Sequence, residues 1–223
     1  MKANEASLEK DKFQLDRIAF FCDAIFAIAI TLLIIEIKVP EVDSDHLSDK
    51  NLLIASAYLI PKFVGFFVSF FVIGLYWLSH HRAFKYVERS SQKLLWSNLM
   101  FMLPIVIMPF STAFLSEYYN GVLRMPLIVY TINICMAGFF SYRLWRIIAR
   151  PENKLTNELN QVIFRYNATR ALAIPIIFVC MVLLSFIHTI IAYIMLPLTP
   201  LMTRAIKNYY LKKYPKIMKA HLQ

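Results

Sequence analysis

The chain has 223 residues, of which 59% are hydrophobic and only 17% charged, and its mean hydropathy is +0.55. Because a soluble domain carries roughly a quarter charged residues, this composition excludes an ordinary soluble protein and indicates an integral membrane protein. The formal net charge is +10, but the lysines and arginines lie between apolar segments, which argues for membrane topology and against nucleic-acid binding.

The first apolar segment contains a carboxylate. It runs RIAFFCDAIFAIAITLLIIEIKV from Arg17 to Val39, which is long enough to cross a bilayer, and Asp23 lies within it. An ionised side chain at membrane depth is costly unless another group pairs with it, so Asp23 marks a functional or structural centre. The preceding residues 1–16 are polar and mixed in charge, and we expect a cytoplasmic arm there and no cleavable signal peptide.

Four further apolar segments predict membrane-spanning helices. Together with a first helix at roughly 18–38, we place them at roughly 52–79, 94–116, 122–148 and 168–185. The last apolar stretch continues to Thr203, which fits either one long helix or a hairpin of two.

The distribution of charge decides the number of spans. Lys and Arg dominate the N-terminal arm, the second and fourth loops and the C-terminal tail, whereas acidic residues dominate the first loop. Under the positive-inside rule both termini are then cytoplasmic, which requires an even number of spans. We therefore divide the last stretch near Phe186–His188 and predict an all-α integral membrane protein with six transmembrane helices. Its expected units are the arm, a membrane domain at residues 17–206 and a basic cytoplasmic tail at residues 207–223.

Polar side chains of three predicted spans lie at one depth, in the inner leaflet. Asp23 lies about six residues inside the first span. The second and third spans bring hydrogen-bond donors to that level, namely Trp77, His80, His81, Trp96 and Asn98. Taken singly, a Trp or His at a helix end is usually an interfacial residue. For Asp23, a structural role in holding helices together competes equally with transport chemistry.

One face of the first span is apolar at helical spacing, because Ile28, Thr31 or Leu32, and Ile35 recur at i, i+3 or i+4, and i+7. Alone, such a stripe is far more often ordinary packing. Beyond it, acidic residues are expected at the external entrance, namely Glu36, Glu41, Asp43, Asp45 and Asp49. They fit either a field that concentrates cations or a solvated acidic loop.

The sequence offers no pattern for catalysis or for a metal or cofactor site. It contains no HExxH motif, nucleophile elbow or Gly-rich phosphate loop. The adjacent His80 and His81 point about 100° apart on a helix, which makes them poor joint metal ligands. Cysteines occur only inside apolar segments, at Cys22, Cys135 and Cys180. We interpret them as small core residues rather than disulfides or ligands.

Three motifs together resemble a known family. The run Arg17-x-x-x-Phe21-Cys22-Asp23 resembles the R-x-x-x-F-S-D signature that opens the first helix of the transmembrane protein 175 family of cation channels, with Cys22 in place of the usual Ser. YWLSHHRAF, from Tyr76 to Phe84, resembles the W-x-x-H-H pattern of the family's second helix. The segment from Trp96 to Tyr118 resembles its third helix, so the resemblance covers roughly residues 17–118.

The resemblance implies a potassium-selective channel in which the first helices line the pore and a hydrophobic constriction replaces a carbonyl filter. A chain with one six-helix repeat implies a homotetramer in the bilayer of a prokaryotic cell membrane, with K⁺ as the permeant ion and no cofactor. By position, the constriction falls on Ile28, with Thr31, Leu32 and Ile35 as further layers. The implied network between helices consists of Arg17, Phe21, Cys22, Asp23, Trp77, His80, His81 and Asn98. The chain has only four Gly and no TVGYG, which agrees with the lack of a carbonyl filter.

Other functions remain open at this point. A proton- or cation-coupled secondary transporter using Asp23 is the main alternative, although the chain lacks a second inverted half and has few Gly to break its helices. An enzyme is not expected, and a non-catalytic assembly factor is not excluded by the residues alone.

Overall fold

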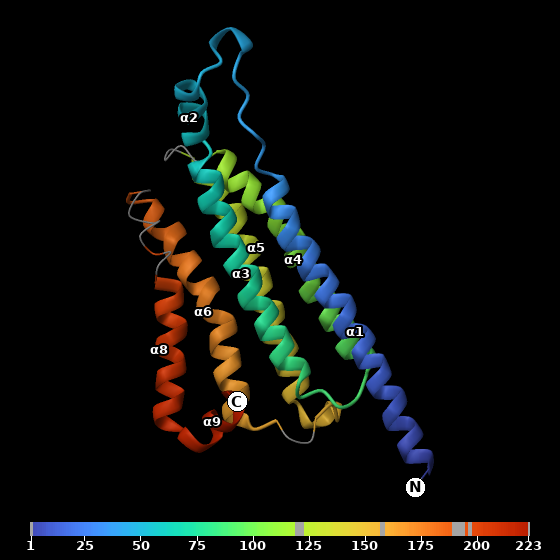
Figure 1. Cartoon of the computed structure of the whole chain (residues 1–223). Coiled ribbons are helices and arrows are strands. Elements are labelled where there is room, and N and C mark those ends of the chain that lie inside the picture. The colour runs from blue at the N-terminus through green and yellow to red at the C-terminus, as the bar shows by residue number, and fades with distance from the viewer. Residues whose placement is uncertain (1, 119–122, 157–158, 189–194, 196–197, 223) are drawn as a thin grey trace.

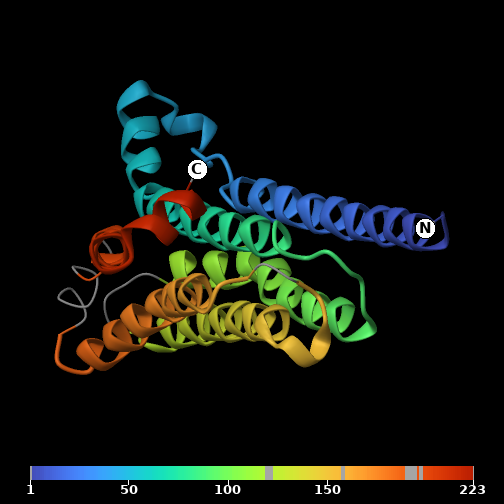
Figure 2. The ribbon, with the colours of Figure 1, turned by 90° about the horizontal axis from the view of Figure 1, so that it is seen from below.

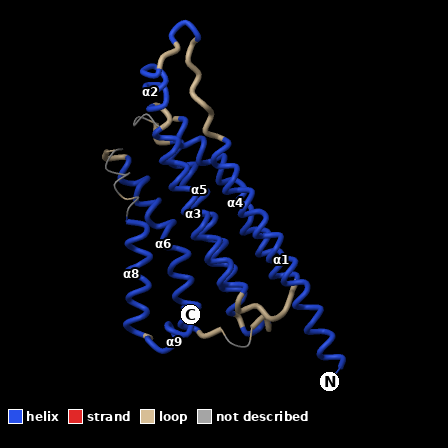
Figure 3. Tube along the Cα trace, in the orientation of Figure 1, coloured by secondary structure: helices blue, strands red, loops and turns tan. Residues whose placement is uncertain are grey.

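The computed structural model describes the chain except residues 1, 119–122, 157–158, 189–194, 196–197 and 223, and the side chains of 2–8, 46 and 222. The described part is helical, and no strand occurs in it (Figure 3). The helices are α1 (Lys2–Ile35), α2 (Asp49–Ala57), α3 (Ile60–Phe84), α4 (Gln92–Glu117), α5 (Met125–Ala149), α6 (Gln161–Ser185), α8 (Leu198–Lys213) and α9 (Pro215–Leu222), with 3₁₀ turns at Ser44–His46 and Pro151–Asn153.

Among the described residues, five helices are long and apolar enough to cross a membrane, namely α1 from Glu9 onward, α3, α4, α5 and α6. They form one bundle in which α4 contacts α1, α3 and α5, and α6 packs on the far side of α5. Viewed from below, α1 and α3 form one layer, and α5 and α6 another, with α4 between them (Figure 2). The two chain ends lie at the same end of the bundle (Figure 1).

The predicted second span has different bounds in the structure. The chain breaks at Tyr58–Leu59, so that α2 is a separate short helix, and Pro61 sits in the first turn of α3. Proline is well tolerated there because backbone N–H groups in the first turn have no acceptor within the helix, so the absence of one N–H costs no hydrogen bond. Helix α3 then continues to Phe84, which places His80 and His81 inside the helix rather than after it.

The fifth span also begins earlier than predicted. The Asn160 side chain accepts a hydrogen bond from the backbone N–H of Val162 at 2.8 Å and starts α6 at Gln161 instead of near 168. Arg165 and Arg170 therefore lie on the helix and not in the preceding loop.

The all-helical membrane fold is confirmed, with five candidate spans and further helices among the described residues, and the predicted sixth span is not shown. Helix α6 ends at Ser185, at the predicted break, and α8 packs against α6 and returns toward the end that holds both termini (Figure 1). Residues 189–194 and 196–197, which begin the predicted sixth helix, lie outside the described residues. The 16 residues of α8 are too few to count as a span by themselves. Helix α8 also runs across the expected boundary between residues 206 and 207, and α1 is continuous with the N-terminal arm.

The core lies on the inner faces of α1 and α3–α6. Its largest fully buried side chains are Trp145, Tyr76, Tyr130, Tyr166, Phe26, Phe101 and Phe178. At the crossing of α5 and α6, a Cβ atom added to Gly138 would lie only 2.8 Å from the carbonyl oxygen of Ala171. The glycine therefore permits the close approach of these two helices.

Candidate functional site

Helix α1 has two contrasting faces. Cys22, Phe26, Ala29 and Leu33 are buried against the bundle. The predicted stripe lies about 200° away around the helix, because each of its residues except Leu32 is offset by two positions from a buried one. In the single chain Ile28 is 57% exposed, Leu32 40% and Ile35 67%, and Thr31 is exposed as well. The stripe therefore faces away from the rest of its own subunit.

Asp23 contacts α3. Its Oδ1 accepts a hydrogen bond from the Trp77 indole Nε1–H at 2.9 Å. Asp23 lies five residues from Ile28, and five steps of about 100° turn it about 140° away from the stripe. The carboxylate therefore joins α1 to α3 at the side of the stripe and does not line it.

A second, buried group of polar side chains joins α1, α3 and α4. The Asn98 amide donates a hydrogen bond to the Cys22 sulfur at 2.8 Å, and the His80 Nε2–H donates to Asn98 Oδ1 at 2.8 Å, because that oxygen can only accept. All three side chains are buried. The His80 ring packs between Phe84 and Phe101, with centroid distances of 4.4 and 6.0 Å.

The expected network is thus divided into two parts. Sequence reasoning made His80 and Asn98 donors to Asp23, whereas in the structure they bond through Asn98 to Cys22. Arg17, Phe21 and His81 are exposed and take no part in either group of hydrogen bonds among the described residues. The Arg17 guanidinium lies 5.9 Å from the Phe13 ring centre, and the His81 ring lies 5.9 Å from that of Trp77.

Arg17 and Phe21 do line a common groove. It has a volume of about 710 Å³ and lies between α1 and the first turns of α4, where Trp96 and Asn98 form its other wall. Two exposed aromatic side chains, Phe21 and Trp96, share this groove. Exposed apolar groups that lie together are typical of a surface that contacts another chain or the membrane.

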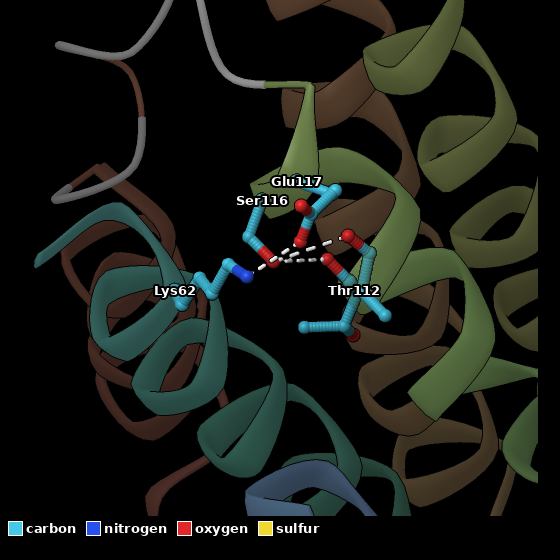
Figure 4. A network of polar contacts seen from close by, with 5 residues as sticks. Lys62, Thr112, Ser116 and Glu117 are labelled. Atoms are coloured by element: carbon cyan, nitrogen blue, oxygen red, sulfur yellow. Dashed lines mark hydrogen bonds and ion pairs between the residues drawn. The ribbon is translucent and has the colours of Figure 1, made fainter. Parts of the chain in front are cut away.

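The opposite end of the bundle carries an ion pair that sequence reasoning missed. Lys62 of α3 and Glu117 of α4 are joined at 2.5 Å, next to the Ser116 hydroxyl, which donates to the Thr112 carbonyl at 2.8 Å (Figure 4). A pocket of about 400 Å³ beside them is also lined by Glu36. The signal was present, because opposite charges interrupt two apolar segments at the same expected outer end.

Sequence reasoning also missed a hydroxyl cluster between α3, α4 and α5. Thr112 donates to Ser69 at 2.7 Å, and Ser69 bonds the Tyr130 hydroxyl at 2.8 Å. Such bonds hold helices together where hydrocarbon offers no alternative partner. In the part of the chain that the structure describes, no group of three or more His, Cys, Asp or Glu residues is arranged to hold a metal ion.

Comparison with known proteins assigns the chain to a family. Residues 17–109 match the family described as "Endosomal/lysosomal potassium channel TMEM175". A potassium channel of Chamaesiphon minutus is 34% identical over 147 residues, which cover 65% of this chain and 71% of that protein. The chain belongs to the TMEM175 family.

Other members of the TMEM175 family are also similar. A potassium channel of Streptomyces collinus is 36% identical over 59% of this chain, and the match spans 63% of that relative's length. The mouse endosomal/lysosomal proton channel TMEM175 is 28% identical over 58% of this chain but only 27% of its own. The crystal structure of a lysosomal potassium-selective channel TMEM175 homolog from Chamaesiphon minutus superposes with a TM-score of 0.70 at 26% identity, covering 88% of this chain and 98% of that one.

The TMEM175 match confirms the resemblance and locates it. Residues 17–109 comprise α1 from Arg17 onward, all of α2 and α3, and most of α4. They therefore contain the stripe, the Asp23–Trp77 bond and the Cys22–Asn98–His80 group, whereas α5 to α9 lie outside the matched segment. The family is one of ion channels and not of enzymes.

Proposed function

We propose that this chain is a potassium channel in which copies of α1 surround a central pore, with Ile28 as its narrowest layer. Membership of the TMEM175 family supports this proposal, as do the bacterial relatives named potassium channels, although the Streptomyces relative is matched over only 63% of its length. The permeant ion is K⁺, and the channel needs no cofactor.

The observation that carries the proposal is the exposure of α1. In its most apolar stretch only 22% of the residues are buried, against 33% to 50% in the other four spans. One flank of α1 packs on α3 and α4, and the stripe lies opposite. A pore on the axis of an oligomer places that stripe against its own copies, because one helix per chain encloses a pore only when several chains assemble. Four copies, as the family resemblance implies, give a homotetramer.

The chemistry of the stripe suits a hydrophobic constriction. A ring of Ile28 side chains conducts when it is wide enough to stay wet and closes by losing water when it narrows. K⁺ holds its hydration shell less tightly than Na⁺, so partial dehydration at this ring favours K⁺. The Thr31 hydroxyl donates to the Ile28 carbonyl at 2.9 Å, which leaves its oxygen lone pairs for a passing cation. Thr31, Leu32 and Ile35 form the layers on the outer side.

The orientation follows from charge. The end of the bundle with both termini bears the basic residues of the second and fourth loops and of α8 and α9. We place this end in the cytoplasm of a prokaryotic cell. The acidic loop between α1 and α2, with Glu41, Asp43, Asp45 and Asp49, then lies outside with Glu36.

Proton movement is the second candidate function, in the form of a proton-coupled transporter or a proton conductance. The animal TMEM175 relatives are named proton channels, and Asp23 is a carboxylate well inside the first span. Its bond to Trp77, away from the stripe, favours a structural role instead.

Ion flux into vesicles tests the proposal. The purified full chain in lipid vesicles should pass K⁺ down its gradient with no coupled ion and pass Na⁺ more slowly. Ile28→Asn makes the constriction hydratable and should raise the flux and reduce the preference for K⁺ over Na⁺.

Ile34→Asn is a matched control, because Ile34 is exposed on α1 about 120° from the Ile28 direction. Equal behaviour of the two variants would remove Ile28 from the constriction. Potassium flux through a preparation that is monomeric by native mass spectrometry would contradict a pore built from several α1 helices, and proton flux coupled to K⁺ would favour the transporter.

A further inference from the structure

Two arginines meet at the end of the bundle that holds the chain termini. Arg82 is near the end of α3 and Arg170 lies on α6, and both line a narrow crevice between α3, α6 and α8. Above them the crevice is lined mainly by apolar atoms, for example from Leu75 and Ile174. Its enclosed volume is only about 20 Å³, so that a ligand larger than water must sit at its mouth.

Neither arginine is neutralised by a carboxylate in the part of the chain that the structure describes. The Nε atom of Arg82 is buried and has no hydrogen-bond partner. Arg170 donates to the Tyr166 hydroxyl at 3.1 Å and lies 5.4 Å from that ring's centre. Among the described residues neither guanidinium forms an ion pair with a carboxylate. The ion pair found among these residues joins Lys62 to Glu117, at the opposite end of the bundle. A buried polar group without a partner is rare enough in native proteins to need an explanation.

The surrounding charges are positive as well. His221 of α9 is buried beside the arginines, where its Nδ1 bonds the Tyr86 hydroxyl at 2.6 Å and Tyr166 packs against its ring. Burial, and then the positive charges of Arg82, Lys85 and Arg170, lower the pKa of His221 to about 4. The imidazole is therefore neutral at pH 7, and no carboxylate is among the groups that shift it. Among the described residues, no carboxylate is paired with this positive cluster.

We propose that Arg82 and Arg170, with Lys85 at the rim, bind a phosphate group, supplied either by an anionic phospholipid of the inner leaflet or by free phosphate. Guanidinium groups bind phosphate oxygens in pairs of parallel hydrogen bonds. Basic pockets between spanning helices on the cytoplasmic side are typical sites for anionic headgroups.

The position of the cluster favours the lipid as the source. Arg170 directly precedes the stretch Ala171–Ser185, and Arg82 directly follows the stretch Phe63–His81, neither of which contains Lys, Arg, Asp or Glu. Both arginines therefore lie where the hydrocarbon ends and the headgroups begin. A phosphate at the mouth of the crevice leaves the lipid chains to run up its apolar side, along α6.

Lipid retention by the purified full chain tests the site. Native mass spectrometry would compare phosphatidylglycerol with zwitterionic phosphatidylcholine, and thermal unfolding at constant ionic strength would compare phosphatidylglycerol with inorganic phosphate. We expect phosphatidylglycerol to be retained and to raise the melting temperature. Arg82→Gln and Arg170→Gln should each weaken its retention by about tenfold or more, the loss expected when a charge-assisted hydrogen bond to a phosphate group is removed.

The control variants distinguish lipid binding at the arginine cluster from general electrostatic attraction between a basic protein surface and anionic lipid. Arg143→Gln and Arg146→Gln remove the same charge from exposed positions near the same end of α5 and should leave retention unchanged. Equal losses in all four variants would overturn the proposal, as would the absence of a preference for phosphatidylglycerol together with no stabilisation by inorganic phosphate. Stabilisation by inorganic phosphate that depends on Arg82 and Arg170 would support the site and identify free phosphate as its source. If Arg82→Gln does not fold, Arg170→Gln and the exposed Lys85→Gln give the same comparison.

Discussion

At the scale of single residues, Cys22 and Asp23 are neighbours with different partners. Successive helical residues point about 100° apart, so Cys22 turns toward α4 while Asp23 turns toward α3. Cys22 accepts from Asn98, and Asp23 accepts from Trp77. The two groups tie the proposed pore helix to both of its neighbours.

Asn98 is the central member of the buried group. Asn98→Ala leaves the His80 ring N–H without its acceptor and should lower the free energy of unfolding by roughly 1–3 kcal/mol, the cost of an unpaired buried group. Thermal unfolding of the detergent-solubilised protein measures this. Cys22→Ser is the control, because a hydroxyl also accepts from the Asn98 amide and should change stability little. An Asn98→Ala variant as stable as the parent would mean that the two hydrogen bonds of this group contribute nothing to stability.

Asp23 should position α1 rather than contact the ion. Asp23→Ala removes the acceptor for Trp77 and should reduce folding yield and assembly, while the protein that survives keeps its preference for K⁺. Trp77→Phe removes the same hydrogen bond from the other side and should have a similar effect on yield. Size-exclusion chromatography and vesicle flux read out the two properties. If Asp23→Ala assembles normally but loses selectivity or conduction, Asp23 is a permeation residue.

At the scale of helices, α5 and α6 approach each other closely where they cross. There Gly138 faces the Ala171 carbonyl and the Pro175 ring. Pro175 lies inside α6, where it is tolerated because the neighbouring α5 shields the interrupted turn.

Substitution of two glycines tests this contact. Gly138→Ala should lower the free energy of unfolding by about 1–3 kcal/mol, because an added methyl group forces the two backbones apart. Gly74→Ala is the matched control, since a Cβ atom there meets no atom within 4 Å. It should be neutral or stabilise α3 by up to about 1 kcal/mol, the difference in helix propensity between the two residues. Equal melting temperatures for the two variants would contradict the close approach of α5 and α6.

At the scale of the whole molecule, the C-terminal helix connects segments far apart in sequence. On α9, Met218 and His221 are buried, and His221 joins α9 to Tyr86 in the loop after α3. Tyr86 in turn packs near Trp145 of α5, with ring centres 6.3 Å apart. The tail thus closes the basic end of the bundle instead of extending as a free segment.

The attachment of α9 should weaken in acid. The pKa of His221 is lowered to about 4 by burial and by neighbouring positive charges, below the value of about 6.5 in an unfolded chain. The unfolded or detached form therefore binds the proton more readily. The stabilisation from His221 is complete above about pH 6.5 and is lost as the pH falls toward 4. Hydrogen exchange of residues 215–222, corrected for the intrinsic effect of pH, should rise between pH 7 and pH 5, and His221→Gln should remove this dependence. A pH-independent protection of α9 in the parent would contradict it.

The sequence alone determined the class of protein, the family and both ends of α4 and α5 to within about three residues. These features depend on local properties, namely long apolar runs, the positive-inside bias and the motifs of the first three predicted spans. It predicted the second and fifth spans less accurately, because a proline in a first turn and an asparagine cap set those boundaries.

Only the tertiary structure decided which polar groups meet. Depth along a span follows from residue number, so the sequence brought Asp23, Trp77, His80 and Asn98 to one level. The direction in which each side chain points depends on how the helices are rotated about their axes, and packing against neighbours sets that rotation. Packing therefore divided the expected network, turned Ile28 and Ile35 away from their own subunit, and brought Arg82, Arg170 and His221 together from three separate helices.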